Sequence, residues 1–483
     1  MDKQMSGTAT ARHLVDEAWQ ALGGPPADTA RVELTGPAVT LASRLPVTAL
    51  AQASVAVAGL AAAGFAAARD GGSPPPVTVD SRAAAVAFTS ERHLRIDGEA
   101  QRLWAPLSRF LPAADGWVRL HGNYPHHRAR LFAALDVDPD GDDPPAAVAR
   151  TVAERPARDV EDAVTARGGL AVAVRTADEW RRSAQGEAVA RTPLVAVERV
   201  TDAPAPRRAA APTDPLLPAD GIRVLDLTRV IAGPVGTRTL AAFGADVLRV
   251  DSPRLPEIPV QHVDTGFGKR STLLDLGVPG DRDTFETLLA EADVLVYGYR
   301  AGALDRYGLA PDAVLERHPR LVVATLNAWG PVGPWAGRRG FDSLVQAATG
   351  IAVVEAGGDP AAVAAGDREP GVLPAQALDH GTGYLLAAAV LRALTGQLAE
   401  GGGWRVELSL ARTGGWLLDH ACDQPDAVAF DPAPRLARVP SPFGELTYAL
   451  PPARVDGAPV TWADPPVPWG SSRPRWRDHR PIG

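Results

Sequence analysis

The sequence predicts an α/β protein built around a parallel sheet, and two observations carry the prediction. Beyond residue 220, short runs rich in Val, Ile and Leu alternate with segments of helical period, which is typical of strands joined by covering helices. A Pro/Ala-rich linker, residues 201–220, separates this region from residues 91–200, where strand-like and helical segments also mix. We therefore expect a large α/β domain at 221–483, with a C-terminal tail, preceded by a smaller α/β domain.

The composition argues against several classes of protein. A net charge of −8 without any Lys/Arg cluster does not fit a nucleic-acid binder. The single cysteine, Cys422, excludes a disulfide framework and a Cys-based metal cluster. His420 lies close to it, but we expect a buried, inert thiol. The first residues lack a basic start followed by an apolar run, so the expected location is the cytoplasm.

The N-terminal region begins with an amphipathic helix at 12–22. The uncharged stretch 45–68 is long enough to span a bilayer, but it is mostly Ala and contains Gln52 and Ser54. We therefore expect a helix packed inside the protein and no membrane contact. A strand-like segment, VTVDSR, follows at 77.

This region resembles a later part of the same chain. LPVTALAQASVAVAGLAAA from residue 45 aligns with LPAQALDHGTGYLLAAAVL from residue 373, and a strand-like segment follows each copy at nearly the same offset. The alignment places Ala51 opposite Asp379. Residues 1–90 are therefore predicted to be a helical segment and a degenerate partial copy of the large domain.

The elements of the two α/β regions follow from their periodicity. In residues 91–200 we expect strands at 94–96, 116–120 and 170–174 and helices at 123–135, 144–166 and 177–182. In the large domain we expect strands at 222–227, 246–250, 294–297 and 321–326 and helices at 237–243, 281–291 and 311–316. Ligands of parallel sheets bind beyond the carboxyl ends of the strands. The segments at those ends are Arg229–Pro234, Asp251, Tyr297–Gly302 and Asn327–Gly330.

One acid in the second copy attracts particular interest. Asp379 stands before the predicted small-residue turn His380–Gly383, and a helix with apolar residues at helical spacing follows. A carboxylate in this position can cap the free N–H groups of the helix. Flexible glycines and a helix N-terminus also suit a nucleophile that attacks a thioester. The local sequence leaves both interpretations open.

A series of longer motifs bears on this choice. GIRVLDLTRVIAGPVGTRTLAAFGADVLRVDSP, GKRSTLLDL, ADVLVYGYRAGALDRYGL, HPRLVVATLNAWGPVGPWAGRRGFDSLVQAATG and LPAQALDHGTG follow one another from residue 221 to about 418. In this order they resemble CoA-transferase family III, the CaiB/BaiF family. The resemblance implies a Rossmann-like, nucleotide-type domain and a smaller α/β domain. Here the small domain comes first, so the family fold looks permuted and partially duplicated.

The resemblance implies an acyl-CoA:carboxylate CoA-transferase. Asp379 would attack the thioester, and catalysis would pass through an aspartyl anhydride and an aspartyl-CoA thioester. The N–H groups of Gly381 and Gly383 would steady the developing negative charge. An acyl-CoA and a carboxylic acid acceptor would be the substrates, with no cofactor and no metal. Family members form interlocked homodimers. A homodimer is expected here too, with the alternative that the two halves of this permuted chain take the place of the interlocked pair.

The resemblance also implies residues that bind coenzyme A. Lys269, Arg306 and Arg339 would face the phosphates, and Tyr299 would pack on the adenine. Without the resemblance, each of these cations reads as an ordinary solvated surface charge. The complete implied set is Val230, Ile231, Ala232, Lys269, Tyr299, Arg300, Arg306 and Arg339.

Three alternative functions are weighed against a CoA-transferase. In 2-methylacyl-CoA racemases a His precedes the Asp that is Asp342 here; this chain has Phe341, which disfavours a racemase. A dehydrogenase is disfavoured because the G-x-G-x-x-G fingerprint is absent. A non-catalytic CoA-binding subunit is the third alternative. It is favoured by Ala51 and by Tyr297–Tyr299, which stands where the family usually has an Asn.

Overall fold

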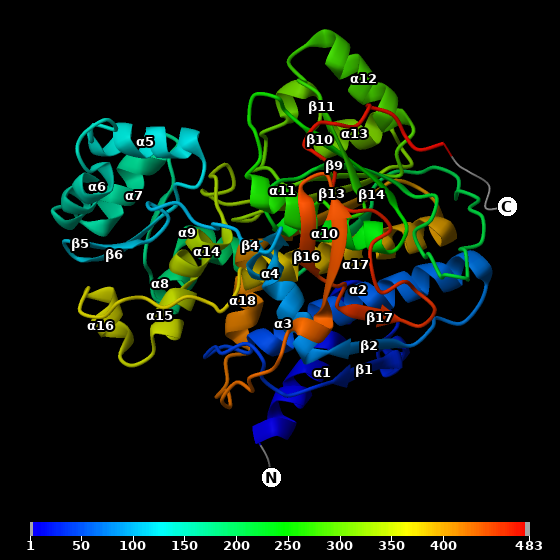
Figure 1. The fold of residues 1–483 in the computed structure, drawn as a ribbon, viewed down its shortest axis with the longest axis horizontal. Coiled ribbons are helices and arrows are strands. Elements are labelled where there is room, and N and C mark those ends of the chain that lie inside the picture. The colour runs from blue at the N-terminus through cyan, green and yellow to red at the C-terminus, as the bar shows by residue number, and fades with distance from the viewer. Residues whose placement is uncertain (1–2, 479–483) are drawn as a thin grey trace.

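The computed structural model describes residues 3–478 and has one large sheet at its centre (Figure 1). Seven strands form it in the order β11-β10-β9-β12-β13-β14-β8. Strands β9 to β14 are parallel, and β8 is antiparallel to β14. The bounds are β8 Ala196–Arg199, β9 Arg223–Leu227, β10 Asp246–Asp251, β11 Lys269–Leu273, β12 Val294–Tyr297, β13 Val322–Asn327 and β14 Trp404–Ser409.

The predicted strands of the large domain are confirmed as β9, β10, β12 and β13. All four residues of β12 are buried, as expected for an apolar strand of a parallel sheet with covered faces. Strand β11 was missed because its sequence, KRSTL, is polar and shows no apolar alternation. The sheet therefore extends one strand further at this edge than the apolar pattern predicts.

Helices cover both faces of the large sheet. Helices α10 Ala232–Ala242 and α17 Ala377–Glu400 share a core with one face, and α12 Pro279–Ala290 and α13 Pro311–Arg317 share a core with the other. Strand β9 lies between β10 and β12, and α10 begins just beyond its carboxyl end. Helix α10 starts five residues before the helix predicted at 237–243, because Ala-Gly-Pro reads as a loop although proline fits the first turn of a helix.

The N-terminal region forms a second, smaller sheet. Its order is β1-β2-β17, with β1 parallel to β2 and β17 antiparallel to β2. The predicted helix at 12–22 lies largely within a longer helix, α1. The bounds are α1 Lys3–Ala21, η1 Pro26–Arg31, β1 Val32–Thr35, α2 Val47–Asp70, β2 Val77–Asp80, α3 Ser81–Phe88, α4 Ser90–His93 and β17 Ala453–Val455.

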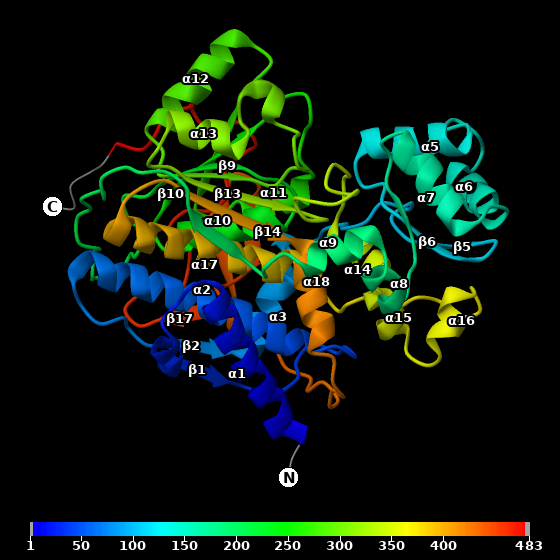
Figure 2. The same cartoon turned by 180° about the vertical axis from the view of Figure 1, so that it is seen from behind.

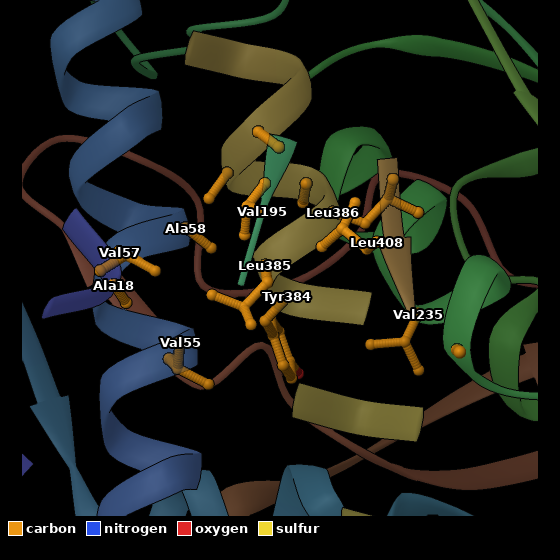
Figure 3. Packing of buried hydrophobic residues seen from close by; sticks show 14 of the residues in the cluster. Ala18, Val55, Val57, Ala58, Val195, Val235, Tyr384, Leu385, Leu386 and Leu408 are labelled. Atoms are coloured by element: carbon orange, nitrogen blue, oxygen red, sulfur yellow. The ribbon is translucent and has the colours of Figure 1, made fainter. Parts of the chain in front are cut away.

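Helix α2 is the predicted Ala-rich core helix. By length and composition it is the one helix among residues 3–478 that could cross a membrane, with a mean hydropathy of 1.7 in its apolar window. However, 94% of that window is buried inside the protein. Figure 3 shows Val55 and Ala58 of α2 close to Leu385 of α17. The prediction of a buried helix is confirmed, because its apolar surface is covered by other parts of this chain.

A small lobe projects to one side of the large sheet (Figures 1 and 2). We use this name for the antiparallel sheet β5-β6-β7 with its three helices. The helix predicted at 144–166 is two helices, because Pro156 interrupts it. The bounds are β5 Phe110–Ala113, β6 Gly116–Leu120, β7 Ala171–Ala173, α5 Pro125–Leu135, α6 Pro144–Ala153 and α7 Ala157–Ala166.

A fourth sheet, β15-β16-β3-β4, joins segments from both ends of the chain. It packs on the large domain through Phe267 and Tyr448, whose rings lie 4.3 Å apart. The remaining bounds are β3 Arg95–Ile96, β4 Glu99–Ala100, α8 Ala177–Arg181, α9 Ala184–Ala190, α11 Pro259–Thr265, η2 Asp305–Tyr307, α14 Asp342–Thr349, α15 Ile351–Ala356, α16 Pro360–Ala364, α18 Leu410–Asp419, η3 Ala433–Arg435, β15 Leu436–Ser441 and β16 Gly444–Ala449.

Candidate active site

Asp379 lies in the first turn of α17 and is 6% exposed. The backbone donors at this helix end are satisfied by another residue. Asp342, the first residue of α14, accepts from the N–H groups of Leu378 and Asp379 at 2.9 and 3.0 Å. Its second oxygen accepts from Gln346. The capping interpretation of Asp379 is therefore wrong: Asp342 caps the helix, and the carboxylate of Asp379 is left without a hydrogen-bond donor among the described residues.

Asp379 is one of three buried carboxylates around this helix end, and its proton affinity is raised by burial and by the other two. Burial, and then the negative charges of Asp342 and Glu91, hold the pKa of Asp379 well above its ordinary value. Burial also raises the pKa of Asp342 to about 6, although the hydrogen bond from Gln346 opposes the rise. Asp379 is thus a carboxylate of raised basicity, which favours attack on a carbonyl once its proton is lost.

Glu91 reaches this site from α4, in the N-terminal half of the chain. Its Oε2 lies 3.4 Å from Nε2 of His380, and the His380 ring stacks on Phe88 at 5.3 Å. Burial favours a raised pKa at Glu91, but the contact with His380 outweighs it and the pKa is lowered. Glu91 therefore carries its negative charge beside Asp379. Neither Glu91 nor the capping role of Asp342 is predicted from the sequence.

Gly381 and Gly383 lie inside α17, so the predicted small-residue turn ahead of the helix is wrong. Inside a helix, a backbone N–H donates to the carbonyl four residues earlier and is not free for a developing oxyanion. These glycines instead permit close packing. An added Cβ would lie 2.5 Å from the carbonyl oxygen of Ala232 at Gly383, and 3.4 Å from Leu50 at Gly381.

Gly383→Ala is expected to lower the free energy of unfolding by about 1–3 kcal/mol, since α10 and α17 must move apart. The added Cβ would also lie 2.9 Å from the Cβ of Val235 on α10. Gly64→Ala in α2 is the matched control. Nothing lies within 4 Å of its added Cβ, so this variant is expected to gain about 0.5–1 kcal/mol. Urea unfolding of both variants measures the difference, and equal stabilities would contradict the packing argument.

Val230, Ile231 and Ala232 lie where predicted, at the carboxyl end of β9. Val230 adopts a left-handed conformation, with φ of 70°, which is strained for a β-branched residue. Its N–H donates to Oε2 of Glu257 at 3.2 Å. Glu257 also forms an ion pair with Arg249. This loop places Ala232 against α17 at Gly383, so the two predicted groups of site residues lie side by side.

Lys269 was predicted to face the phosphates of coenzyme A, but it lies inside the protein and is only 3% exposed. Its Nζ donates to Oδ2 of Asp226 at 3.1 Å, to the Pro234 carbonyl at 2.8 Å and to Oγ1 of Thr237 at 2.6 Å. Burial lowers the pKa of Lys269 to about 8. The predicted contact with phosphates is corrected: all the donors of this ammonium group are engaged beneath α10, where a phosphate does not reach.

The predicted arginines fall into two groups. Arg300 donates to the carbonyl of Gly337 at 3.2 Å, which brings it to the segment that carries Arg339. Burial, and then the charges of Arg300 and Arg130, lower the pKa of Arg339. Within residues 3–478, none of these three cations has an ion-pair partner, and Arg130 of α5 was missed by the sequence analysis. Together they are a positively charged patch at the edge of the small lobe.

The other two predicted residues are not part of this patch. Arg306 contacts a tyrosine next to it in the chain, and Tyr299 is partly enclosed by the protein. Arg306 lies 4.7 Å from the ring of Tyr307 and donates to its hydroxyl at 2.8 Å. Tyr299 is half-buried, and burial raises its pKa to about 12. The structure therefore brings Arg300 and Arg339 together, but it does not bring Arg306 into contact with them.

Two cavities are lined in part by residues of the small lobe. One, of about 140 Å³, extends from Arg339 and Gly168 to Leu344 of α14. The other, of about 440 Å³, is lined by Trp104, Leu107 and other residues of the lobe. Asp379 lines neither cavity.

Buried histidines of the small lobe face α14. The ring of His121 stacks on Phe341 at 4.0 Å and meets Trp104 edge-on at 6.3 Å. Among residues 3–478, neither ring nitrogen of His121 has a hydrogen-bond partner. Burial, and then the charge of Arg119, lower the pKa of His121 to about 3, so the ring is neutral. A neutral imidazole thus lies against the residue that precedes Asp342, a feature that the sequence analysis did not find.

Cys422 is exposed, so the predicted buried thiol is wrong. It follows the end of α18, and its Sγ accepts from Nε2 of Gln424 at 3.0 Å.

Comparison with known proteins identifies the region that carries this site. Residues 219–454 match the model of CoA-transferase family III. An acetyl-coenzyme A transferase of Hypoxylon pulicicidum is 38% identical over 213 residues, which cover 43% of this chain and 35% of that protein. An acyl-CoA transferase of Gibberella moniliformis is 30% identical over 308 residues, or 61% of this chain and 53% of that protein. A formyl-CoA:oxalate CoA-transferase of Rhodopseudomonas palustris is 34% identical over 205 residues, which cover 40% of this chain and 46% of that protein.

The chain spans about half the length of these relatives or less. Among solved structures, a hypothetical protein from Mycobacterium tuberculosis is 30% identical over 42% of this chain and 58% of that one, with a TM-score of 0.38. A CaiB/BaiF family protein from Brucella suis is 28% identical. The match covers 47% of this chain and 64% of that one, with a TM-score of 0.37. Over residues 219–454, the chain is therefore similar to CoA-transferase family III.

Proposed function

We propose that this protein is an acyl-CoA:carboxylate CoA-transferase with Asp379 as its nucleophile. The observation that carries the proposal is the division of roles at the start of α17. Asp342 accepts the two backbone N–H groups there, and the carboxylate of Asp379 is free to attack. The match to a CoA-transferase family and relatives named as acyl-CoA and formyl-CoA:oxalate CoA-transferases support the reaction class.

In the first half-reaction, an oxygen of Asp379 attacks the thioester carbonyl. The C–S bond breaks, which gives a mixed anhydride and a CoA thiolate. The thiolate is a stable leaving group because thiol pKa values lie near about 8.5. It then attacks the aspartyl carbonyl of the anhydride. The C–O bond to the donor acyl group breaks, the donor acid leaves as a carboxylate, and an aspartyl-CoA thioester is formed.

In the second half-reaction, the acceptor carboxylate attacks the aspartyl-CoA thioester and expels the thiolate. The thiolate attacks the acceptor's acyl carbonyl in the new anhydride, which releases the acceptor as its CoA thioester and restores Asp379. Acyl groups, electron pairs and charge balance over the cycle. The cap that Asp342 provides holds the first turn of α17 in place while its neighbour changes covalent state.

For coenzyme A, we propose that the phosphates bind Arg300 and Arg339, with Arg130 as an additional cation from the small lobe. Val230, Ile231 and Ala232 then face the pantetheine arm, and Tyr299 and Arg306 remain proposed contacts of the nucleotide.

We also propose that the fold is a permuted, partially duplicated version of a Rossmann-like family domain. The series β1, α2, β2, α3 repeats the types and order of β13, α17, β14, α18, apart from α14, α15 and α16, which are inserted after β13, and both long helices have 24 residues. The third residues of these helices are Ala49 and Asp379, so the first copy lacks the nucleophile here as well as in the alignment with Ala51. The homodimer that the resemblance implies stays part of this proposal.

The reaction is tested by offering acyl-CoA donors together with ¹³C-labelled carboxylate acceptors. We expect labelled acyl-CoA to accumulate for at least one pair, in amounts equal to the donor acid released. Formation of free CoA alone, with every pair, would contradict a transferase and indicate a hydrolase.

Glu91→Gln is expected to shift the acid limb of the pH–rate profile to lower pH. Asp379 attacks as the anion, and the charge of Glu91 raises the pKa of Asp379. Removing that charge lowers this pKa, so activity persists further into acid. Glu99→Gln, which alters an exposed glutamate of β4, is the control and leaves the profile unchanged. A shift to higher pH, or none, would contradict this electrostatic link.

A racemase is a second candidate because of His121. Racemization needs two acid/base groups at the α-carbon, and the absent histidine at position 341 argued against it. The neutral ring of His121 stacks on Phe341. An imidazole from another segment therefore lies beside position 341, where the racemases have their histidine. Deuterium incorporation at the α-carbon of a 2-methylacyl-CoA in D₂O would favour the racemase. Acyl exchange without deuterium incorporation would exclude it.

A further inference from the structure

Away from the candidate active site, two histidines and a glutamate meet on the surface. His13 and Glu17 lie one turn apart on α1, and His420 caps the C-terminal end of α18 (both helices are labelled in Figure 2). Nε2 of His13 lies 3.2 Å from Oε1 of Glu17, and Nε2 of His420 lies 3.0 Å from Oε2. One ligand atom from each residue lies within 4.8 Å of the others.

The surroundings orient these groups as metal ligands are oriented. Nδ1 of His420 lies 2.9 Å from the carbonyl oxygen of Trp416. A carbonyl only accepts, so Nδ1 carries a hydrogen, and Nε2 is the ring nitrogen left to bind a metal ion beside Glu17. The indole N–H of Trp416 donates to Oε2 of Glu17 at 2.8 Å. Outer hydrogen bonds of this kind fix the tautomer and direction of ligating imidazoles and carboxylates.

The spacing fits a tetrahedral ion. Bonds of about 2.0–2.1 Å from Zn²⁺ to nitrogen or oxygen put neighbouring ligand atoms about 3.3 Å apart. The two nitrogen–oxygen distances, 3.2 Å from His13 to Oε1 of Glu17 and 3.0 Å from His420 to Oε2, are close to that value. Two imidazoles with one carboxylate suit Zn²⁺ and its neighbours in the transition series, and a set of three leaves one position for water. His13 is exposed, so an ion can enter from solvent.

We propose that His13, Glu17 and His420 bind one divalent transition-metal ion, of the Zn²⁺ class. The ion links α1 to the end of α18, segments that are about 400 positions apart in the chain, and it stabilises the folded state by binding to it alone. None of the three residues takes part in the proposed transfer reaction. Failure of this proposal therefore leaves the role of Asp379 untouched, and the reverse also holds.

The test uses the full chain without a histidine tag, stripped of metal by a chelator. Calorimetric titration with Zn²⁺ is expected to show one site per chain, and excess Zn²⁺ raises the Tm. Co²⁺ bound in its place gives the visible absorption of a tetrahedral complex. His13→Ala is expected to weaken Zn²⁺ binding by at least about tenfold and to remove the rise in Tm. Since the His13 side chain is 61% exposed, this variant should fold.

Two controls sharpen the result. His318→Ala removes a histidine that lies 3.6 Å from Glu286 without a second imidazole, and it is expected to leave Zn²⁺ affinity unchanged. Cys422→Ser, two positions after His420, is expected to keep the affinity within about twofold. No saturable binding, equal binding by the wild type and His13→Ala, or loss of binding only in Cys422→Ser would each overturn the proposal.

Discussion

Asp379→Asn is expected to lower kcat for CoA transfer by at least about 10⁴-fold, because an amide cannot form the acyl intermediates. The fold should survive the change. The pKa of Asp379 is raised in the folded protein, so its charged form is a cost to stability at neutral pH, and a neutral side chain of the same shape removes that cost. We therefore expect a Tm equal to or above that of the wild type.

Asp367→Asn is the matched control for this loss. Asp367 is an exposed carboxylate in the same part of the chain, and its replacement is expected to leave kcat and Tm unchanged. Asp379→Asn that keeps more than a tenth of the wild-type kcat would contradict a nucleophilic role. A fall in both kcat and Tm would indicate that the carboxylate supports the fold instead.

Lys269→Ala is expected to lower the free energy of unfolding by about 3–5 kcal/mol, since Asp226 is left charged and buried without its partner. Asp226 is fully buried, and Lys269 is the cation within 3.1 Å of it. Urea unfolding gives the value. A surface phosphate ligand would behave differently: its loss would raise KM for acyl-CoA and leave stability nearly unchanged.

A double variant separates these possibilities. Lys269→Met with Asp226→Asn removes both charges and is expected to recover at least half of the lost stability. Arg306→Ala, at an exposed arginine, is the control and should change stability by less than about 0.5 kcal/mol. Near-wild-type stability of Lys269→Ala, with a large rise in KM, would contradict the buried ion pair and restore the predicted phosphate contact.

The sequence predicts the large sheet well wherever a strand is apolar on both faces, as in β12. It also predicts α2 as a buried core helix, because Ala-rich, uncharged segments are stable only where other elements cover them. It fails at β11, where the polar residues KRSTL are buried by partners that come from elsewhere in the chain. Lys269 illustrates the reason. A lysine reads as a surface charge until its carboxylate partner is known.

The candidate site was predicted in part. The sequence places Asp379 at the start of a helix and Val230–Ala232 after a strand, and these two segments lie side by side. Glycines at 381 and 383 suggested a turn by their local preference, but both lie inside α17, and close packing of α10 on α17 is what requires Gly383. Asp342 and Glu91 reach Asp379 only through the tertiary fold, and no local pattern links Glu91 to a residue so far along the chain.

The most direct measurement is to trap the intermediate on Asp379. Full-length protein is incubated with acetyl-CoA, quenched with hydroxylamine, digested and analysed by peptide mass spectrometry. The account predicts a hydroxamate on Asp379 in the wild type, dependent on acetyl-CoA and absent from Asp379→Asn. An unmodified Asp379 in protein that retains bound CoA would contradict it and identify a CoA-binding protein without transferase chemistry.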